Sequence, residues 1–333
     1  MTYGFVGPAR RGACGWGAAL LAFVLAWVPG SATAQTIITF AGGANNAPLQ
    51  ENVPATQQSL SPRAIAMGPD GYLYVAEPFR GLVRRISPAG VINTFAGNGT
   101  LATTGDGGPA LSAGLNGPVS LAFDNAGNLL IGCEWDYVIR KVTPAGIIST
   151  VAGIVGSTAS TGSGGPASAA SLAFPSALFV APEGSVYVSE RYGHRVRRID
   201  PQGVIHEFAG NGSFAAAKTG PATGVPVPEP GAVAMDSLGR VYITTGTNYP
   251  GTVRVELDGT AAQVFNAAPA AWLTGPAGQM DFTTSAMVTR FRAPLAPERL
   301  VGTATCRTSP SPWTTGSRAR RRTAPARWHR RRR

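Results

Sequence analysis

The stretch GPVSLAFDNAGNLLIGCEWDYVIRKVTPAGIISTVAG, residues 117–153, decides the fold. It contains four short apolar runs, VSLAF, NLLIG, VIRKV and IISTVAG, which are separated by DNAG, EWDY and TPAG. Short runs rich in Val, Ile, Leu and Phe, bounded by Gly, Pro and Asp, predict strands and tight turns rather than helices. One such unit therefore predicts a four-stranded antiparallel sheet.

Three sequence markers show that this unit recurs at a fixed period. The first is TFAG or a variant of it, at spacings of 55, 56 and 57 residues, ending at Gly42, Gly97, Gly153 and Gly210. The second is a proline that is followed nine residues later by glycine, at Pro62, Pro118, Pro175 and Pro230. The third is RRISPAG with its variants, ending at Gly90, Gly146, Gly203 and Gly259. Four-stranded units repeated in one register predict an all-β propeller, whose blades bury their faces only against neighbouring blades.

The repeat also resembles a known family. The unit at 117–153 and its counterpart FPSALFVAPEGSVYVSERYGHRVRRIDPQGVIHEFAG, residues 174–210, are similar to the NHL repeat, in particular to the bacterial secreted form with a GDGGPA loop between units. The resemblance covers about residues 36–266. It implies a β-propeller, usually six-bladed in that family, and for most members a binding or scaffolding role rather than catalysis.

The N-terminus has the pattern of an export signal. Arg10 and Arg11 precede an apolar run at 18–28, and Ala32-Thr33-Ala34 fits a cleavage site with small residues. The run is too short to span a bilayer. We therefore expect residues 1–34 to be a cleaved signal peptide and the mature protein to be secreted or periplasmic, without a transmembrane anchor.

Residues 35–300 form the predicted propeller, with repeats at about 36–98, 99–153, 154–210 and 211–267 and a partial fifth unit at 268–300. The segment 36–42 resembles a lone fourth strand, which we expect to complete the last blade and remove an exposed sheet edge. The pattern then stops in the basic, low-complexity segment 301–333. We interpret that segment as an out-of-frame product that truncates the propeller, or as a disordered basic tail.

The charge distribution excludes a nucleic-acid-binding face on the body of the protein. The formal charge of +11 consists of +10 from ten arginines in 301–333, +2 from the first 35 residues and −1 from residues 36–300. A stripe of basic side chains, which phosphate binding requires, is therefore not expected on the propeller. A composition of 44% hydrophobic and 14% charged residues also excludes a wholly disordered chain.

Carboxylates and arginines recur with the repeat. Glu77, Glu134 and Glu190 follow the predicted second strand of successive units, and six or seven residues later come Arg84, Arg140 and Arg197. A ring of carboxylates could hold a Ca²⁺ ion. Because the pattern occurs once per blade, we favour structural pairs that tie the second strand to the third. The same arginines could equally pair with the next blade. We expect no cofactor. For Asp106, in TGDGGPA, we expect turn chemistry, since its counterparts in later units are not acidic.

Catalytic motifs are scarce. Of the three histidines, His194 lies in the turn before a third strand, where NHL units often carry His, and we expect a structural role for it. A zinc-dependent lyase on this fold would need several converging histidines. Cys133 lies in an apolar run and is expected to be buried.

The loops between the fourth strand of one unit and the first strand of the next are the candidate binding region. They are about 20 residues long, at 98–117, 154–174 and 211–229, and long loops on a compact scaffold are often functional. They share one face with the connections that carry Glu77, Trp135 and Tyr192. The candidate contact residues on this face are Glu77, Asp106, Glu134, Trp135, Glu190, Tyr192 and His194. We thus expect an exported, non-enzymatic module that binds a protein or a glycan. The alternative is a lyase or lactonase that uses a divalent cation.

Overall fold

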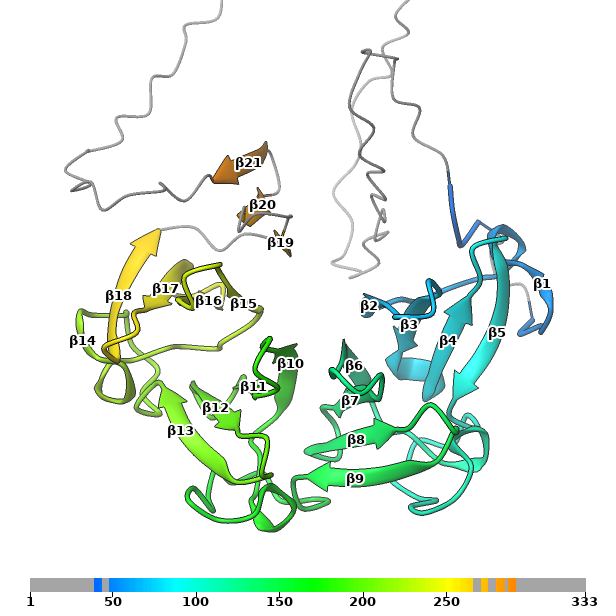
Figure 1. The fold of residues 1–333 in the computed structure, drawn as a ribbon, viewed down its shortest axis with the longest axis horizontal. Helices are drawn as coiled ribbons and strands as arrows, with labels where there is room; N and C mark the ends of the chain where they lie inside the picture. Colours follow the sequence, from blue (N-terminus) through cyan, green and yellow to red (C-terminus); the bar gives the residue numbers. More distant parts are fainter. Residues whose placement is uncertain (1–38, 44–47, 266–270, 275–279, 285–286, 292–333) are drawn as a thin grey trace, which may run out of the picture. The chain divides into compact units, whose positions relative to one another are not determined.

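The computed structural model describes residues 39–43, 48–265, 271–274, 280–284 and 287–291. These residues form antiparallel sheets with short 3-10 turns (Figure 1). Each of the four repeats forms one sheet in which four strands follow one another in chain order. This confirms the predicted all-β propeller with four-stranded antiparallel blades. The predicted signal peptide at 1–34 and the basic segment at 301–333 lie outside the described residues.

The strands of the four blades have similar lengths. Blade 1 contains β2 (Ala64–Met67), β3 (Leu73–Glu77), β4 (Leu82–Ile86) and β5 (Val91–Ala96). Blade 2 contains β6 (Pro118–Phe123), β7 (Leu129–Cys133), β8 (Val138–Val142) and β9 (Ile148–Ala152). Blade 3 contains β10 (Pro175–Val180), β11 (Val186–Glu190), β12 (Arg195–Ile199) and β13 (Ile205–Ala209). Blade 4 contains β15 (Val233–Met235), β16 (Val241–Thr245), β17 (Gly251–Val255) and β18 (Thr260–Phe265).

A further sheet falls within the range predicted for the incomplete fifth unit. It has three strands in chain order, β19 (Ala271–Thr274), β20 (Met280–Thr284) and β21 (Met287–Phe291).

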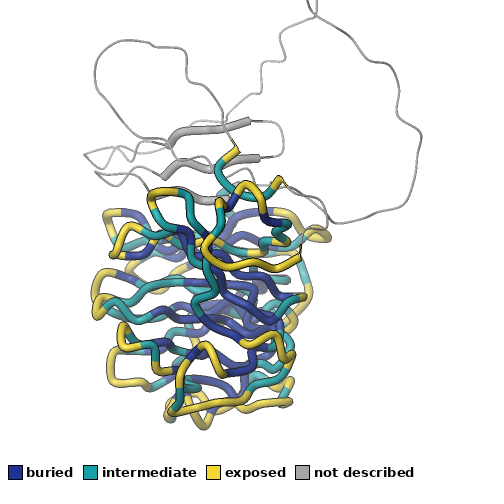
Figure 2. Tube along the Cα trace, turned by 90° about the vertical axis from the view of Figure 1, so that its right-hand side faces the viewer, coloured by how far each residue is buried: buried dark blue, intermediate teal, exposed yellow. Residues whose placement is uncertain are grey.

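The hydrophobic core lies between blades. One cluster joins Tyr74 and Val83 of blade 1 to Ile131 and Val138 of blade 2, and two similar clusters join blade 2 to blade 3 and blade 3 to blade 4. The first strands β2, β6, β10 and β15 contact one another in series. Buried segments accordingly lie inside the stack of blades and exposed turns lie outside it (Figure 2). Most of the core is therefore shared between neighbouring blades. A fourth cluster, which includes Val75 and Ile92, lies within blade 1 and the segment that precedes it.

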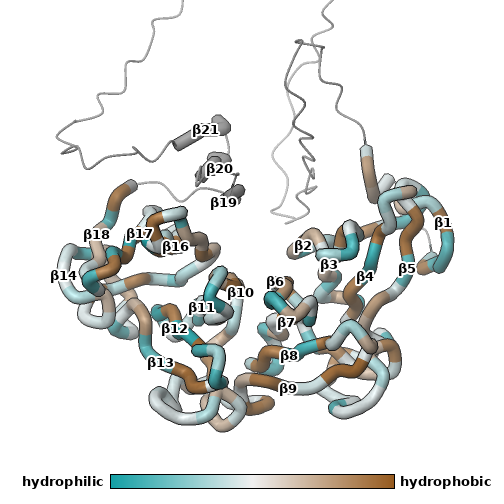
Figure 3. Tube along the Cα trace, in the orientation of Figure 1, coloured by the Kyte–Doolittle hydropathy of each residue, from teal (hydrophilic) through white to brown (hydrophobic). Residues whose placement is uncertain are grey.

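The long loops cover the outer edge of each sheet. After the loop leaves one blade, a Pro-Ala pair runs beside the fourth strand of the next blade and enters a short 3-10 turn. In blades 1 and 4 the pairing residues form the two-residue strands β1 (Val53–Pro54) and β14 (Gly220–Pro221), beside β5 and β18 (Figure 1). In blades 2 and 3 they form the bridges Pro109–Ile147 and Pro166–Val204. Both β9 and β13 contain hydrophobic segments (Figure 3), in which Ile148, Ala152, Ile205 and Ala209 are buried.

The alanine of this pair joins two blades through its backbone. The Ala110 amide donates to the Gly146 carbonyl at 2.8 Å in its own blade, and the Ala110 carbonyl accepts from the Gly97 amide at 2.9 Å at the end of the preceding blade. The same two bonds are made by Ala55, Ala167 and Ala222, each at the start of one 3-10 turn: η1 (Ala55–Gln57), η3 (Ala110–Ser112), η4 (Ala167–Ala169) and η5 (Ala222–Gly224). We call this repeated pair of hydrogen bonds the alanine clasp. The glycine that ends the first sequence marker is its donor, and the glycine that ends the third marker is its acceptor. The paired residues of each long loop consequently protect an edge strand.

The described part of the predicted lone strand, residues 39–42, is not a strand. It nevertheless makes the clasp of the other repeats, because the Gly42 amide donates to the Ala55 carbonyl at 3.0 Å. Phe40 and Ala41 pack against buried residues of blade 1, including Val75.

Candidate functional site: the connection face

The connections between second and third strands lie at the same end of each sheet as the starts and ends of the long loops. In blade 2, Cys133 at the end of β7 pairs with Pro118, where β6 begins, and with Val138, where β8 begins. Ala152 at the end of β9 pairs with Ile139 at this end of β8. We call this end of the sheets the connection face. It consists of the connections 78–81, 134–137, 191–194 and 246–250 and of the ends of the loops 98–117, 154–174 and 211–229.

Arginines at one repeat position are fully buried and hold the long loops. In β8, Arg140 Nη2 lies 2.7 Å from Asp106 Oδ1. The Arg140 side chain also donates to the carbonyls of Thr104 and Gly114. In blade 1, Arg84 Nη2 donates to the Gln50 carbonyl at 2.8 Å and lies 3.5 Å from a carboxylate oxygen of the neighbouring loop residue, Glu51. Each arginine thus reaches into the loop that precedes its own blade. Asp106, for which the sequence predicts turn chemistry, is the ion-pair partner of a buried arginine.

The predicted pairs between the second and third strands are seen in one of the three blades. Glu190 Oε1 lies 3.5 Å from Arg197 Nη1. Glu77 instead contacts Arg80, at 3.3 Å. The reason is the loop: Glu51 and Asp106 stand four residues before the clasp alanine and capture the arginines of blades 1 and 2, whereas Ser163 stands at that place in blade 3.

Glu134 is not the structural counterpart of Glu77 and Glu190. The last residue of the second strand is Glu77 in β3 and Glu190 in β11, but it is Cys133 in β7. Cys133 is buried as expected. Burial raises the pKa of its thiol to about 12. The three glutamates therefore do not share one position in the repeat, and Glu134 lies one residue farther along, where it contacts Arg191 of the next blade at 3.7 Å.

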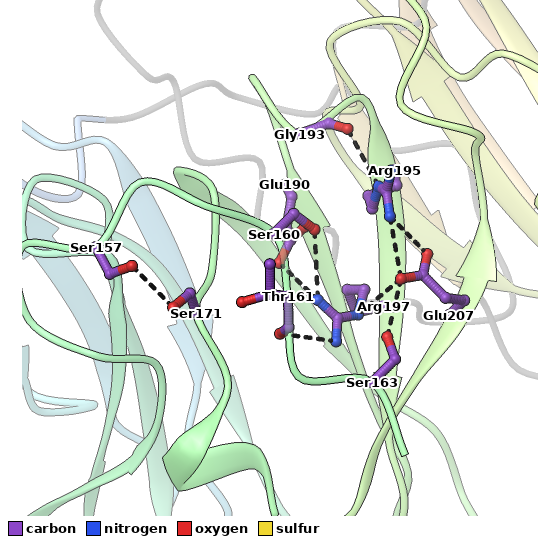
Figure 4. Close-up of polar contacts among 10 residues, drawn as sticks. All are labelled: Ser157, Ser160, Thr161, Ser163, Ser171, Glu190, Gly193, Arg195, Arg197 and Glu207. Atoms are coloured by element: carbon purple, nitrogen blue, oxygen red, sulfur yellow. Dashed lines mark hydrogen bonds and ion pairs between the residues drawn. The ribbon is translucent and has the colours of Figure 1, made fainter. Parts of the chain in front are cut away.

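Blade 3 carries a compact polar cluster beneath the connection face (Figure 4). The Ser160 hydroxyl donates to Glu190, and Arg197 lies between Glu190 and Glu207. Glu207 also accepts two hydrogen bonds from Arg195 at 3.0 Å. In blade 3, Glu207 on the neighbouring strand β13 thus takes the place of the loop acid of blades 1 and 2.

Glu190 is a buried carboxyl with a high proton affinity. Burial raises its pKa to about 7, and the Ser160 hydrogen bond and the charge of Arg197 oppose this shift without cancelling it. The side chain therefore changes its charge near neutral pH, at the point where the loop 154–174 meets the end of β11.

His194 has a structural contact that joins blades 3 and 4. Its Nδ1 accepts a hydrogen bond of 3.1 Å from the Glu229 amide, and its ring lies 5.1 Å from the Phe214 ring. Burial lowers the pKa of His194.

Aromatic rings form contacts across every junction between the four blades on this face. We call the following residues the aromatic row: Phe79, Trp135, Tyr137, Phe174, Tyr192, His194, Phe214 and Tyr249. Ring centroids are 5.4 Å apart for Phe79 and Trp135, between blades 1 and 2. Phe174 joins Tyr137 to Tyr192 at 4.7 and 4.6 Å, between blades 2 and 3. Phe214 continues the row from His194 to Tyr249 at 5.1 and 5.2 Å, into blade 4.

Several rings of the row are open to solvent. The exposed fraction is 74% for Phe79, 55% for Tyr192, 46% for Phe214 and 37% for Tyr249, while Trp135 is half-buried. Sequence reasoning named Trp135, Tyr192 and His194 as candidate contact residues and missed the other members of the row. A repeat signal was present, because Phe79, Trp135 and Tyr192 each stand two residues after the end of their second strand.

Backbone strain also concentrates here. Of the five non-glycine residues with positive φ in the described chain, four lie on the connection face: Tyr137, Phe174, His194 and Glu229. Tyr137 and His194 share one repeat position, which Gly81 occupies in blade 1 at φ 60°. Bulky residues in the left-handed region cost conformational energy, and such outliers cluster at functional sites.

No cluster of three or more His, Cys, Asp or Glu side chains suited to a metal ion occurs among the described residues. The same part of the chain contains no helix that is long and apolar enough to cross a membrane.

Comparisons with known proteins find similarity in structure only. No protein-family model matches the sequence, and a search of curated proteins finds no match. Virginiamycin B lyase from Staphylococcus aureus has a TM-score of 0.48 at 17% identity, with 73% of this chain and 74% of that chain covered. A gluconolactonase from Xanthomonas campestris has a TM-score of 0.48 at 13% identity, with 69% and 71% covered. An auxiliary nutrient binding protein from Bacteroides ovatus has a TM-score of 0.49 at 11% identity, with 68% and 57% covered. These propellers include enzymes and binding proteins, so the likeness concerns the fold and not the activity.

Proposed function

We propose that the chain is an exported propeller of the NHL type that acts as a non-enzymatic binding or scaffold module, with a protein or a glycan as its ligand. The ligand contacts the connection face. The aromatic row carries this proposal, because rings on this face form contacts at each junction between the four blades, and several of these rings are exposed to solvent.

Two further features support the connection face. Tyr137 and Phe174, two members of the row whose rings are in contact, both have left-handed backbone conformations. Glycine would adopt these conformations at a lower cost in conformational energy. In addition, exposed aromatic residues are enriched where proteins bind partners, since a rigid ring contributes a large contact area at a small cost in entropy.

Retention on the cell envelope tests the proposal. A face variant, with Phe79→Ala, Tyr192→Ala and Phe214→Ala, is compared with a back variant, with Met67→Ala, Leu238→Ala and Leu257→Ala. The back variant also removes three exposed apolar side chains, at 56%, 53% and 78% exposure, but from the strand ends and turns at the opposite end of the sheets. Circular dichroism and thermal unfolding confirm that both variants are folded.

Envelopes are prepared from cells of the source organism in which the gene has been deleted. We expect the wild-type chain and the back variant to sediment with these envelopes, and the face variant to stay in solution. Equal retention of the two variants, or no retention of the wild-type chain, would contradict the proposal.

Metal analysis separates this function from its alternative. The proposal includes no cofactor, whereas a lyase or lactonase of the alternative class would hold a divalent cation. Stoichiometric Ca²⁺ or Zn²⁺ that survives gel filtration, together with loss of a hydrolytic or lyase activity on chelation, would favour the enzyme.

A further inference from the structure

We infer that the aromatic row is a track for an uncharged polysaccharide, with one ring per blade placed against successive sugar units. This inference rests on the proposed binding function and specifies its ligand. The observation that carries it is positional: Phe79, Trp135 and Tyr192 occupy one repeat position in three consecutive blades, and blade 4 has Thr247 at this position.

A repeating ring surface matches the chemistry of a pyranose polymer. One side of a pyranose ring presents C–H groups, and these pack on the electron-rich face of an aromatic ring. The rings of Phe79 and Tyr192 are more than half exposed, so they have free surface for such contacts. Successive sugars of a linear glycan then meet successive rings, and weak contacts add along the chain because the units are linked.

Polar groups beside the rings suit the hydroxyl groups of a sugar. Asp136 lies between Trp135 and Tyr137 in the chain and accepts a hydrogen bond of 2.7 Å from Asn116 Nδ2. Asn116 itself ends one of the long loops of the connection face. Carboxylate and amide groups with remaining hydrogen-bonding capacity are the usual partners of hydroxyl groups, which both donate and accept.

The charges of the face argue for an uncharged ligand. Glu77 is paired with Arg80, and Glu134 is paired with Arg191. The arginines of the connections are thus partly neutralised within the protein, and Asp136 adds a negative charge beside Trp135. A polyanion would meet no basic stripe here, and a polycation would meet few free carboxylates.

Calorimetric titration of the purified full chain tests the inference. The probes are cellohexaose, chitohexaose, xylohexaose, laminarihexaose and maltohexaose, with the corresponding disaccharides and with hexagalacturonate as the anionic comparison. We expect at least one neutral hexasaccharide to bind, and its disaccharide to bind about tenfold more weakly or worse. The face variant should lose about tenfold or more in affinity, while the back variant keeps the wild-type value.

Three results would overturn the inference. The first is that no neutral hexasaccharide binds, and the second is that the face variant binds as tightly as the wild-type chain. The third is that hexagalacturonate binds more tightly than every neutral probe.

A second measurement separates this failure from failure of the proposed function. If the face variant is not retained on envelopes, and prior protease treatment of the envelopes also abolishes retention of the wild-type chain, the ligand is a protein. In that case the glycan assignment is wrong and the binding function stands. We expect retention to survive protease treatment and to be competed by the hexasaccharide that binds.

Discussion

Asp106 Oδ1 lies 2.7 Å from Arg140 Nη2, although 34 positions separate the two residues and Asp106 belongs to the loop before the blade. Arg140 is fully buried and Asp106 is half exposed. The pair therefore fixes a long surface loop to the centre of the following sheet. Blade 4 lacks both partners, since Val253 stands in place of the arginine and Lys218 in place of the acid.

Removal of the buried arginine should destabilise the protein. Arg140→Met leaves the carbonyls of Thr104 and Gly114 without this donor, and we expect the free energy of unfolding to fall by about 3 kcal/mol. Urea unfolding followed by circular dichroism measures the change. The control is Lys141→Met, on the next residue of β8, for which we expect a change within about 0.5 kcal/mol. Equal losses in the two variants would show that Arg140 does not anchor the loop.

The loop acid should contribute less than the arginine. Asp106→Asn keeps a hydrogen-bond acceptor, and half of the Asp106 side chain is in contact with solvent, so we expect a loss of about 1 kcal/mol. The change should be local. Hydrogen exchange should accelerate in residues 100–114 in this variant and stay unchanged in blade 4. Faster exchange in every blade would contradict a local anchor.

Glu190 should make stability depend on pH near neutrality. Its pKa is about 7 in the folded protein and near 4.5 when exposed, so between these values the folded state binds more protons than the unfolded state. The contribution of Glu190 to stability is therefore complete below about pH 4.5 and is lost as the pH rises through about 7. We expect the stability of the wild-type chain relative to Glu190→Gln to fall by about 3 kcal/mol over this range. A difference that does not vary with pH would rule out the shifted pKa.

The glycine of the TFAG marker should tolerate substitution worse than the glycine of the PAG marker. Gly153 has φ 91°, and a Cβ there would collide with the carbonyl oxygen of Tyr137. Gly146 has φ 79° but open space around a Cβ. We expect Gly146→Ala to cost about 1 kcal/mol from its backbone conformation, and Gly153→Ala to cost about 3 kcal/mol or more. Thermal unfolding of the two variants gives the comparison, and equal costs would contradict the role assigned to the close approach.

The period of the sequence predicted the fold because each marker has a backbone function that any blade needs. Gly97 and Gly146 are the donor and the acceptor of the alanine clasp. A change in their spacing would break these two hydrogen bonds, so the spacing is recognisable in the sequence. The use of the loops as outer edges was not predicted. Their pairing partners lie in the following blade, and no periodic hydrophobic pattern marks a two-residue strand.

The candidate site was predicted in part. Trp135 and Tyr192 were found because they stand in short connections, but Phe214 lies in a long loop whose path depends on tertiary contacts. Glu134 was assigned to the wrong position in the repeat. Counting from the turn glycine would have placed Cys133 there, since Gly127 is six residues before Cys133 and Gly71 is six residues before Glu77.

Hydroxyl-radical footprinting of the chain with and without cell envelopes tests the central claim most directly. Mass spectrometry reports the oxidation of Phe79, Trp135, Tyr192 and Phe214 on the connection face and of Met67, Leu238 and Leu257 at the opposite end of the sheets. If the connection face binds the ligand, oxidation of the four aromatic residues falls severalfold while that of the other three residues stays constant. Protection of Met67, Leu238 and Leu257 with unchanged oxidation of the aromatic row would contradict the account.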